Sequence, residues 1–123
     1  MTDADPTPPG VPISAARTTL SQIMTAGDTN LLGTVHGGWI ATLLDSCVGC
    51  AVHSTLPAGK AYTTAELKVN FVRPVTTRLA LVRAVGTIIH VGNRMATAEG
   101  RLVGPDGKLY AHASTTCFIF DTP

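Results

Sequence analysis

The stretch NLLGTVHGGWIATLLDSCVGCAV, residues 30–52, decides the fold of this chain. It places an asparagine, a histidine and two glycines in front of a long apolar run. That run carries a single formal charge, Asp45. A carboxylate in the most apolar segment of a small chain is costly unless it has a partner or a task. The segment is therefore the candidate core element and also the first place to look for a site.

The apolar run predicts one helix from about residue 38 to residue 56. Pro57 and Gly59 follow it and are helix-ending residues. The run also holds Asp45 and several serines, threonines and glycines, which argues against a membrane span. At about 100° per residue, one stripe of this helix collects Thr42, Asp45, Ser46, Gly49 and His53.

That stripe has two interpretations. A solvent-facing stripe normally carries lysine, glutamate and glutamine, whereas this one carries small residues and one acid. Small residues allow another helix or a ligand to come close. Both interpretations stay open from the stripe alone.

Downstream of the helix the sequence alternates in the manner of strands. In YTTAELKVNFVR, residues 62–73, period two predicts a half-buried strand that ends before Pro74. Its expected buried face reads Thr63, Ala65, Leu67, Val69 and Phe71, and its other face Thr64, Glu66, Lys68 and Asn70. Further strands are expected over residues 78–91, 95–103 and 108–120, with turns at GNR (92–94) and GPDG (104–107).

Short turns between consecutive strands imply an antiparallel sheet. The expected fold class is therefore α+β, with one long central helix wrapped by a curved antiparallel β-sheet of at least four strands. Ahead of the helix, residues 13–24 fit either a short helix or a first strand, and residues 25–38 are turn-rich.

Composition narrows the class of protein. The chain has 123 residues, the size of one domain, with 45% apolar and only 14% charged residues. So few charged side chains suggest that part of the surface is covered by another subunit. We expect a flexible arm over the acidic, proline-rich residues 1–14, which lack a signal-peptide pattern, and a single domain over residues 15–123.

Charge and cysteine usage exclude further classes. The net charge is +1, without a basic block, so we expect no nucleic-acid partner and no membrane partner. Three cysteines are an odd number and their spacing suggests no disulfide framework. A reducing, cytoplasmic location fits best.

The start of the helix is the second candidate feature. Its first backbone N–H groups have no acceptor within the helix and carry the positive end of the dipole. Gly37 would let a ligand approach these groups, which makes them donors for a developing oxyanion. The competing interpretation is that Gly37 and Gly38 only form a turn, with His36 as an ordinary histidine.

Geometry links the helix start to Asp45. Eight residues of helix separate Gly37 from Asp45 by about 12 Å, whereas two groups acting on one carbonyl must each lie about 3 Å from it. Within one chain they cannot meet. Two antiparallel helices from two subunits can bring Gly37 of one to Asp45 of the other, so we expect at least a dimer with shared sites.

The pattern N-x5-HGG-x6-D, followed by GCA and then by TTAELKVNFVRPV, resembles the hotdog-fold acyl-CoA thioesterases of the PaaI-like, phenylacetate-pathway group. The likeness runs from about residue 28 to residue 119. It implies the hotdog fold, hydrolysis of a small, medium-chain or aryl acyl-CoA, and dimers or tetramers. Coenzyme A is then part of the substrate, and no cofactor or metal is expected.

The resemblance also implies roles for individual residues. Asp45 falls on the catalytic acid, acting as nucleophile or as general base for water. Gly37 falls on the backbone donor, with His36 beside it, and Asn30 on the asparagine that helps to place the nucleophile or water. Thr64 falls on a hydroxyl position at the start of the first long strand, and a one-residue ambiguity leaves Thr63 open. The short region before Asn30 leaves the size of the acyl group undefined.

Coenzyme A phosphates need cations and free amides. Arg73 and Arg94 are the candidates, together with Lys68. Arg94 follows a glycine turn in which Gly92 and Asn93 could present backbone N–H groups to phosphate. The alternative is that these cations are simply solvated.

Other reactive residues have plainer explanations. Cys47 and Cys50 form a C-x-x-C pattern in the middle of the helix, where neither thiolate is stabilised, so they are predicted to be small core residues. A metal site built from them and His53 has too few ligands. His90 and His112 lie in predicted strands and are expected to be structural.

Two other functions compete with thioester hydrolysis. A non-catalytic acyl-CoA-binding hotdog module would use the same fold, but a binder has no need for Asp45 beside an intact HGG. A hotdog dehydratase or hydratase would need a different Asp and His pattern near the helix start, which the sequence does not show.

Overall fold

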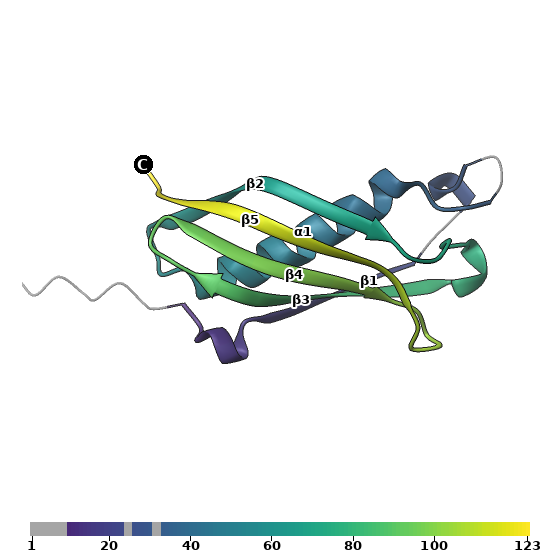
Figure 1. Cartoon of the computed structure of the whole chain (residues 1–123), viewed down its shortest axis with the longest axis horizontal. Coiled ribbons are helices and arrows are strands. Elements are labelled where there is room, and N and C mark those ends of the chain that lie inside the picture. The colour runs from purple at the N-terminus through teal and green to yellow at the C-terminus, as the bar shows by residue number, and fades with distance from the viewer. Residues whose placement is uncertain (1–9, 24–25, 31–32) are drawn as a thin grey trace, which may run out of the picture.

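The computed structural model describes residues 10–23, 26–30 and 33–123. One long helix lies against one curved sheet (Figure 1). The helix is α1, Gly37–Thr55, and the strands are β1 (Arg17–Ile23), β2 (Lys60–Phe71), β3 (Leu81–Val91), β4 (Met95–Val103) and β5 (Leu109–Asp121). Short 3-10 turns are η1 (Ile13–Ala15), η2 (Ala26–Asp28) and η3 (Thr77–Leu79).

The predicted helix is confirmed to within a residue at each end. It stops where the backbone becomes extended at Leu56, with ψ of 135°, because that residue precedes a proline. Its buried side consists of Ile40, Leu44, Cys47, Val48, Gly49, Ala51 and Val52. These side chains form the core together with the inward-facing residues of the sheet.

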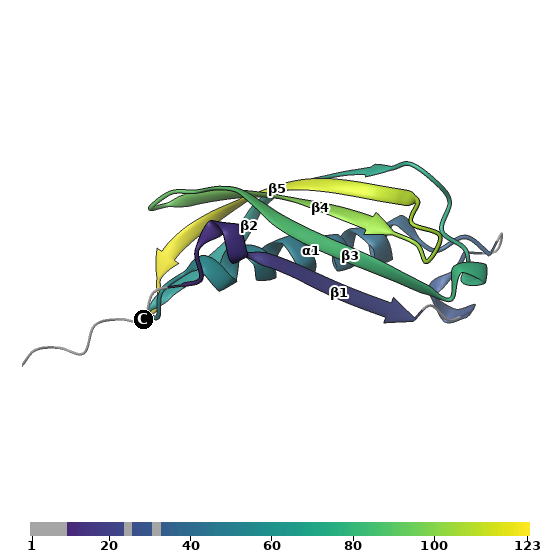
Figure 2. The ribbon, with the colours of Figure 1, turned by 90° about the horizontal axis from the view of Figure 1, so that it is seen from below.

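The sheet has five antiparallel strands in the order β1-β3-β4-β5-β2. Figure 2 shows it curved over α1, which lies on its concave side. β3, β4 and β5 follow one another through short turns, as the sequence predicts. The α+β arrangement with a helix wrapped by a curved antiparallel sheet is confirmed.

Residues 13–24, which the sequence left open as either a short helix or a first strand, contain one of each. It begins with the single turn η1 and then becomes strand β1, which pairs with β3 from Arg17↔Thr87 to Ile23↔Leu81. The sheet therefore gains an edge strand beyond the four that alternation alone predicts.

A pair of glycines sets how closely the helix approaches the sheet. Gly86 of β3 lies opposite Gly100 of β4. A Cβ on Gly86 would lie 2.7 Å from the carbonyl oxygen of Cys47, and one on Gly100 would lie 2.9 Å from Cγ1 of Val48. Only glycine leaves room at these positions, so the pair fixes where α1 crosses the sheet.

The strict alternation predicted for β2 is wrong at one point. The β2–β5 register shifts between Thr64 and Glu66, which leaves Ala65 as an extra, bulged residue. Because one residue is inserted, Thr64 lies on the same side as Leu67 and not opposite to it. The hydroxyl that the alternation assigned to the outer face therefore faces the helix.

The predicted flexible arm covers residues 1–14, of which residues 1–9 lie outside the described part. Within the described remainder, the Val11 amide donates a hydrogen bond of 2.8 Å to the Ser54 carbonyl at the end of α1. Gly10 lies directly on the Thr55 backbone. The chain is thus tied to the helix end before β1 begins.

Two features of the surface bear on assembly. β2 is at one end of the strand order and, within the described residues, pairs with β5 as its one neighbouring strand. Several large apolar side chains are also exposed, among them Phe71, Ile89, Phe118 and Phe120. In the described ranges no helix has the length and hydropathy of a bilayer-spanning segment.

Candidate functional site

Asp45 is half-buried on α1, and among the described residues a threonine of β2 donates a hydrogen bond to it. Its Oδ1 accepts a hydrogen bond from the Thr64 hydroxyl at 2.9 Å. Thr63 is exposed, and its register partner on β5 is Phe118. The bulge at Ala65 thus places Thr64, and not Thr63, against the acid. The cost of a carboxylate in this helix is reduced by partial exposure and by this hydrogen bond.

The other residues of the helix stripe differ in their exposure to solvent. Thr42, Ser46 and His53 are exposed, whereas Gly49 is buried. A Cβ on Gly49 would lie 2.5 Å from the Tyr62 hydroxyl, so the small residue accommodates a strand residue. The Tyr62 ring also packs near His53, with 5.4 Å between ring centroids. Neither interpretation of the stripe holds over its whole length.

The start of α1 is open to solvent. His36 is the N-cap residue and makes no side-chain capping hydrogen bond, and both His36 and Gly37 are exposed. The Gly37 N–H therefore keeps the donor capacity of a first-turn amide. A Cβ on Gly37 would lie 3.2 Å from Cζ of Phe71, so the phenyl ring at the end of β2 covers one side of the glycine.

A loop holds the residues before the helix in place. The Thr34 amide donates to the Asn30 side-chain oxygen at 3.2 Å, and the Asn30 amide donates to the Thr34 carbonyl at 2.9 Å. Gly33 turns the chain with φ of 76°. The Val35 amide then bonds to the Val75 carbonyl at 2.8 Å, which fastens the loop beyond the end of β2.

These residues surround a pocket of about 390 Å³. Its walls include Asn30, His36, Gly37, Phe71 and Arg73. Four of the predicted site residues are thus gathered at the helix start. Phe71 was expected on the buried face of its strand, but it is 55% exposed and forms a wall of this pocket. Its place as the last residue of a strand, just before the turn at Pro74, was the signal available in the sequence.

Asp45 and Thr64 do not line that pocket. Asp45 lies further along α1, about 12 Å from the helix start by the rise of the helix, and Thr64 of β2 lies beside it. One chain therefore holds the predicted site residues in two separate groups, which we call half-sites. One carries the glycine donor, His36 and Asn30, and the other carries the acid and its threonine.

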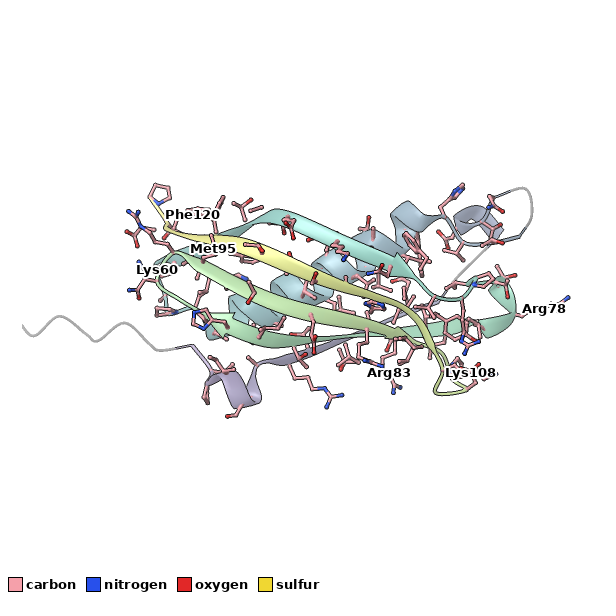
Figure 3. The ribbon with its side chains drawn as sticks, viewed as in Figure 1. Lys60, Arg78, Arg83, Met95, Lys108 and Phe120 are labelled. Carbon is pink, nitrogen blue, oxygen red and sulfur yellow. The ribbon has the colours of Figure 1, made fainter. Side chains whose placement is uncertain are left out.

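The residues predicted to meet coenzyme A are also divided. Arg73 lies at the helix-start pocket, whereas Asn93 and Arg94 line a second pocket of about 580 Å³ with Lys60, Met95, Phe118, Ile119, Phe120 and Asp121. Figure 3 shows Lys60, Met95 and Phe120 together at one end of the sheet. β2 runs from this end to Phe71, so one protomer keeps the two sets apart.

The glycine turn offers fewer donors than expected. The Gly92 amide already donates to the Met95 carbonyl at 2.8 Å, inside the β3–β4 hairpin. Asn93 and Arg94 are exposed. A phosphate at this turn would therefore meet the Arg94 side chain and not the Gly92 backbone.

The cysteines divide into two environments. Cys47 and Cys117 are buried and Cys50 is exposed, so the expectation of two core cysteines in the helix holds only for Cys47. Burial, reinforced by the neighbouring Cys50, raises the pKa of Cys47 to about 12. All three thiols are free, and no group of three or more His, Cys, Asp or Glu side chains in the described residues could hold a metal ion.

Both strand histidines and one of the cations predicted to meet coenzyme A lie on the surface. His90 and His112 are exposed, as is Lys68. None of them lines either of the two pockets that hold predicted site residues.

Comparison with known proteins supports the same interpretation. A Bacillus halodurans protein crystallised with coenzyme A is 31% identical, with a TM-score of 0.79 over 84% of this chain and 67% of its own. A phenylacetic acid degradation-related protein of Ralstonia eutropha is 29% identical, with a TM-score of 0.79 over 89% and 80%. A Halobacterium salinarum protein provisionally named an esterase is 39% identical over 75 residues. That match covers 59% of this chain and 48% of the relative, so the chain matches about half the length of this curated relative.

The sequence model of the thioesterase superfamily matches residues 32–111. The match includes α1, β2, β3 and β4 and reaches the start of β5. It therefore contains Gly37, Asp45 and Thr64, which belong to the two half-sites. On this evidence the chain belongs to the thioesterase superfamily, and the solved structures that resemble it include a protein of the phenylacetate-degradation type.

Proposed function

We propose that this protein is an acyl-CoA thioesterase, which hydrolyses the thioester of an acyl-CoA to a free acid and coenzyme A. The observation that carries the proposal is the Asp45 carboxylate, half-buried in an apolar helix and bonded to the Thr64 hydroxyl at 2.9 Å. The open, glycine-bearing start of the same helix supplies the second element of the chemistry. Coenzyme A bound to the Bacillus halodurans relative supports the choice of thiol.

A thioester needs only modest activation. In the proposed reaction the carbonyl oxygen accepts a hydrogen bond from the Gly37 amide, which stabilises the charge that develops there. Asp45 then acts in one of two ways. It attacks the carbonyl carbon, expelling the thiolate and forming an anhydride that water hydrolyses, or it removes a proton from the water that attacks. Thr64 orients the carboxylate in either route.

The two half-sites require a second subunit in this proposal. β2 has a free edge that can pair with the β2 of another copy. Thr64 of β2 bonds to Asp45, and Phe71 of the same strand covers Gly37. An antiparallel pairing centred on Lys68, with Ala65 as the extra residue of the bulge, sets Thr64 of one strand opposite Phe71 of the other. The acid of one protomer then lies beside the helix start of the other.

The same pairing would unite the divided coenzyme A residues. Arg73 follows β2 at its Phe71 end, and Arg94 lies at the Lys60 end of the sheet. In the paired dimer, the partner subunit's Arg73 lies about three strand spacings, roughly 14 Å, from Arg94. We propose a dimer as the smallest active unit, built into a tetramer through the remaining exposed apolar surface. We place it in the cytoplasm, where its three free thiols would stay reduced.

Release of free thiol from a panel of short, medium, long and aryl acyl-CoAs tests the proposal. Cys50 is exposed, so a thiol-reactive dye will also register about one equivalent per chain, which a substrate-free control subtracts. We expect turnover on at least one substrate. Asp45→Asn should lower kcat by about two to four orders of magnitude while the fold is retained. Wild-type turnover in purified Asp45→Asn would remove Asp45 from the mechanism.

The competing function is a module that binds acyl-CoA without hydrolysing it. Thermal stabilisation by acyl-CoA, with no thiol released from any member of the panel, would favour that function. The Asp45–Thr64 hydrogen bond would then have only a structural role.

A further inference from the structure

Thr115 of β5 is an unusual residue to find in the core. In the described part of the chain it is the only buried serine, threonine, amide or charged residue, at 2% exposed. The other buried inner positions of its strand are Ala111, Ala113, Cys117 and Ile119. A buried hydroxyl costs free energy unless it forms a hydrogen bond, and valine would fill the same space without that cost. The hydroxyl of Thr115 therefore calls for an explanation.

The partner of this hydroxyl lies on the neighbouring strand. Thr115 donates a hydrogen bond of 2.8 Å to the backbone carbonyl of Glu66 on β2, which runs beside β5 (Figure 1). Its single proton is used there, so in its 4.0 Å contact with Cys117 the thiol is the donor. Glu66 follows Ala65, the extra residue of the β2 bulge, and Cys117 is the register partner of Thr64. The bond thus joins β5 to β2 directly at the bulge.

A bulge needs such a bond because it weakens the sheet at its own position. The extra residue is left unpaired and the ladder of backbone hydrogen bonds is disrupted locally. A buried carbonyl without a donor is costly, and in a regular strand the facing backbone amides supply the donors. The Thr115 side chain adds a donor from the buried face of the sheet. It therefore favours the bulged register of β2 over the regular one.

The bulge in turn decides which threonine faces the acid. In a regular strand that keeps Leu67 on the inner face, Thr63 would face α1 and Thr64 would face outward. With Ala65 inserted, Thr64 faces α1 and donates to Asp45 at 2.9 Å. A side chain that stabilises the bulge therefore also stabilises this contact.

We propose that Thr115 is a positioning residue for hydrolysis, because its bond to the Glu66 carbonyl holds the bulge that turns Thr64 toward the acid. This inference rests on the proposed function and adds a residue to its machinery that touches neither substrate nor acid. Since the Thr115 side chain is covered, it acts through Thr64 on the rate of the reaction and not on the binding of the acyl-CoA.

Kinetics of variants on one acyl-CoA test the inference. Thr115→Val keeps the shape of the side chain and removes its hydroxyl, so kcat should fall roughly threefold to tenfold, at most by the loss expected of Thr64→Ala. KM should not change. Thr115→Ser retains the donor and should retain the wild-type kcat. The double variant of Thr64→Ala and Thr115→Val should lose no more than Thr64→Ala alone, because the second residue acts through the first.

A matched control separates positioning from a general loss of stability. Ile88 of β3 packs against the core three strands away from β2 and lines neither pocket that holds predicted site residues. Ile88→Ala should lower the thermal midpoint at least as much as Thr115→Val does, because it removes more apolar volume. Its kcat, measured well below that midpoint, should equal that of the wild type.

Several results would overturn the inference and leave the thioesterase proposal intact. They are a wild-type kcat in Thr115→Val, the same loss of kcat in Thr115→Ser or in Ile88→Ala, and losses that multiply in the double variant. If the wild-type protein hydrolyses no acyl-CoA, the proposed function fails, and a crystal structure of Thr115→Val decides whether Thr115 positions Thr64. Loss of the bulge or of the hydrogen bond to Asp45 would support that role, and retention of both would reject it.

Discussion

A single threonine, Thr64, contacts the one acid of the helix. The Thr64 hydroxyl donates to one oxygen of the Asp45 carboxylate at 2.9 Å. The sequence indicated the acid, because one charge in an apolar run is conspicuous. It left two threonines as candidates for its partner, since side-chain alternation cannot reveal a bulge.

Substitution of the two neighbouring threonines should separate them. Thr64→Ala should lower kcat about tenfold, because it removes one hydrogen bond that orients the carboxylate. Thr63→Ala, its matched control on the outer face, should leave kcat unchanged. Steady-state hydrolysis of one acyl-CoA by both variants is the measurement, and equal losses in the two would show that the hydroxyl contact has no catalytic role.

The three thiols should differ sharply in reactivity. Burial raises the pKa of Cys47 to about 12 and raises that of Cys117, so both stay protonated and covered at neutral pH. Only the exposed Cys50 should react with iodoacetamide in the folded protein, and all three should react in denaturant. Mass spectrometry of the labelled chain checks this, and rapid native labelling of Cys47 would contradict its place in the core.

At the scale of elements, the fold depends on how closely α1 approaches the sheet. Hydrophobic periodicity predicted the long helix and the later strands, because those signals are local and strong. It did not decide on β1, an edge strand whose identity depends on pairing with β3, a contact between distant segments. It also did not reveal the Gly86–Gly100 pair, because a glycine within a strand has the same appearance whether or not a helix lies above it.

Gly86→Ala should therefore destabilise the protein. The added Cβ would lie 2.7 Å from a backbone oxygen of α1, and the helix would have to shift, at a cost of about 1–3 kcal/mol. Gly38→Ala is the control, since nothing lies within 4 Å of its Cβ and alanine favours the helix. In urea unfolding at equal protein concentration, the urea concentration at the midpoint should fall for Gly86→Ala and not for Gly38→Ala. A wild-type midpoint for Gly86→Ala would show that the helix position is not fixed there.

At the scale of the whole molecule, the helix start and Asp45 lie apart within one chain. The donor and the acid were predicted to need two subunits from helix rise alone, and the structure places them in separate half-sites of the protomer. The sequence could not predict that Arg73 and Arg94 line separate pockets, because this depends on which ends of the strands they occupy. Assembly itself remains a prediction.

Mixing two inactive variants tests the shared site. Asp45→Asn removes the acid, and Gly37→Val blocks the donor, where even a Cβ would lie 3.2 Å from Phe71. Each homodimer should be inactive, but a mixed dimer has one site with both defects and one with neither. Random reassembly of equal amounts should therefore restore about a quarter of wild-type activity, if the sites act independently. No recovery, with subunit exchange confirmed by native mass spectrometry, would mean that Asp45 works with a donor of its own chain.

The bulge at Ala65 has a consequence for comparing this chain with its relatives. Alignment gaps are normally assigned to loops, where insertions are tolerated. Here the extra residue lies inside a paired strand, between Thr64 and Glu66. A relative with a regular strand at this position must be aligned with a gap in mid-strand, or its hydroxyl will be matched to Ala65 and its site will look incomplete. An alignment of this family should therefore be anchored on the acid in the helix and not on the strand pattern.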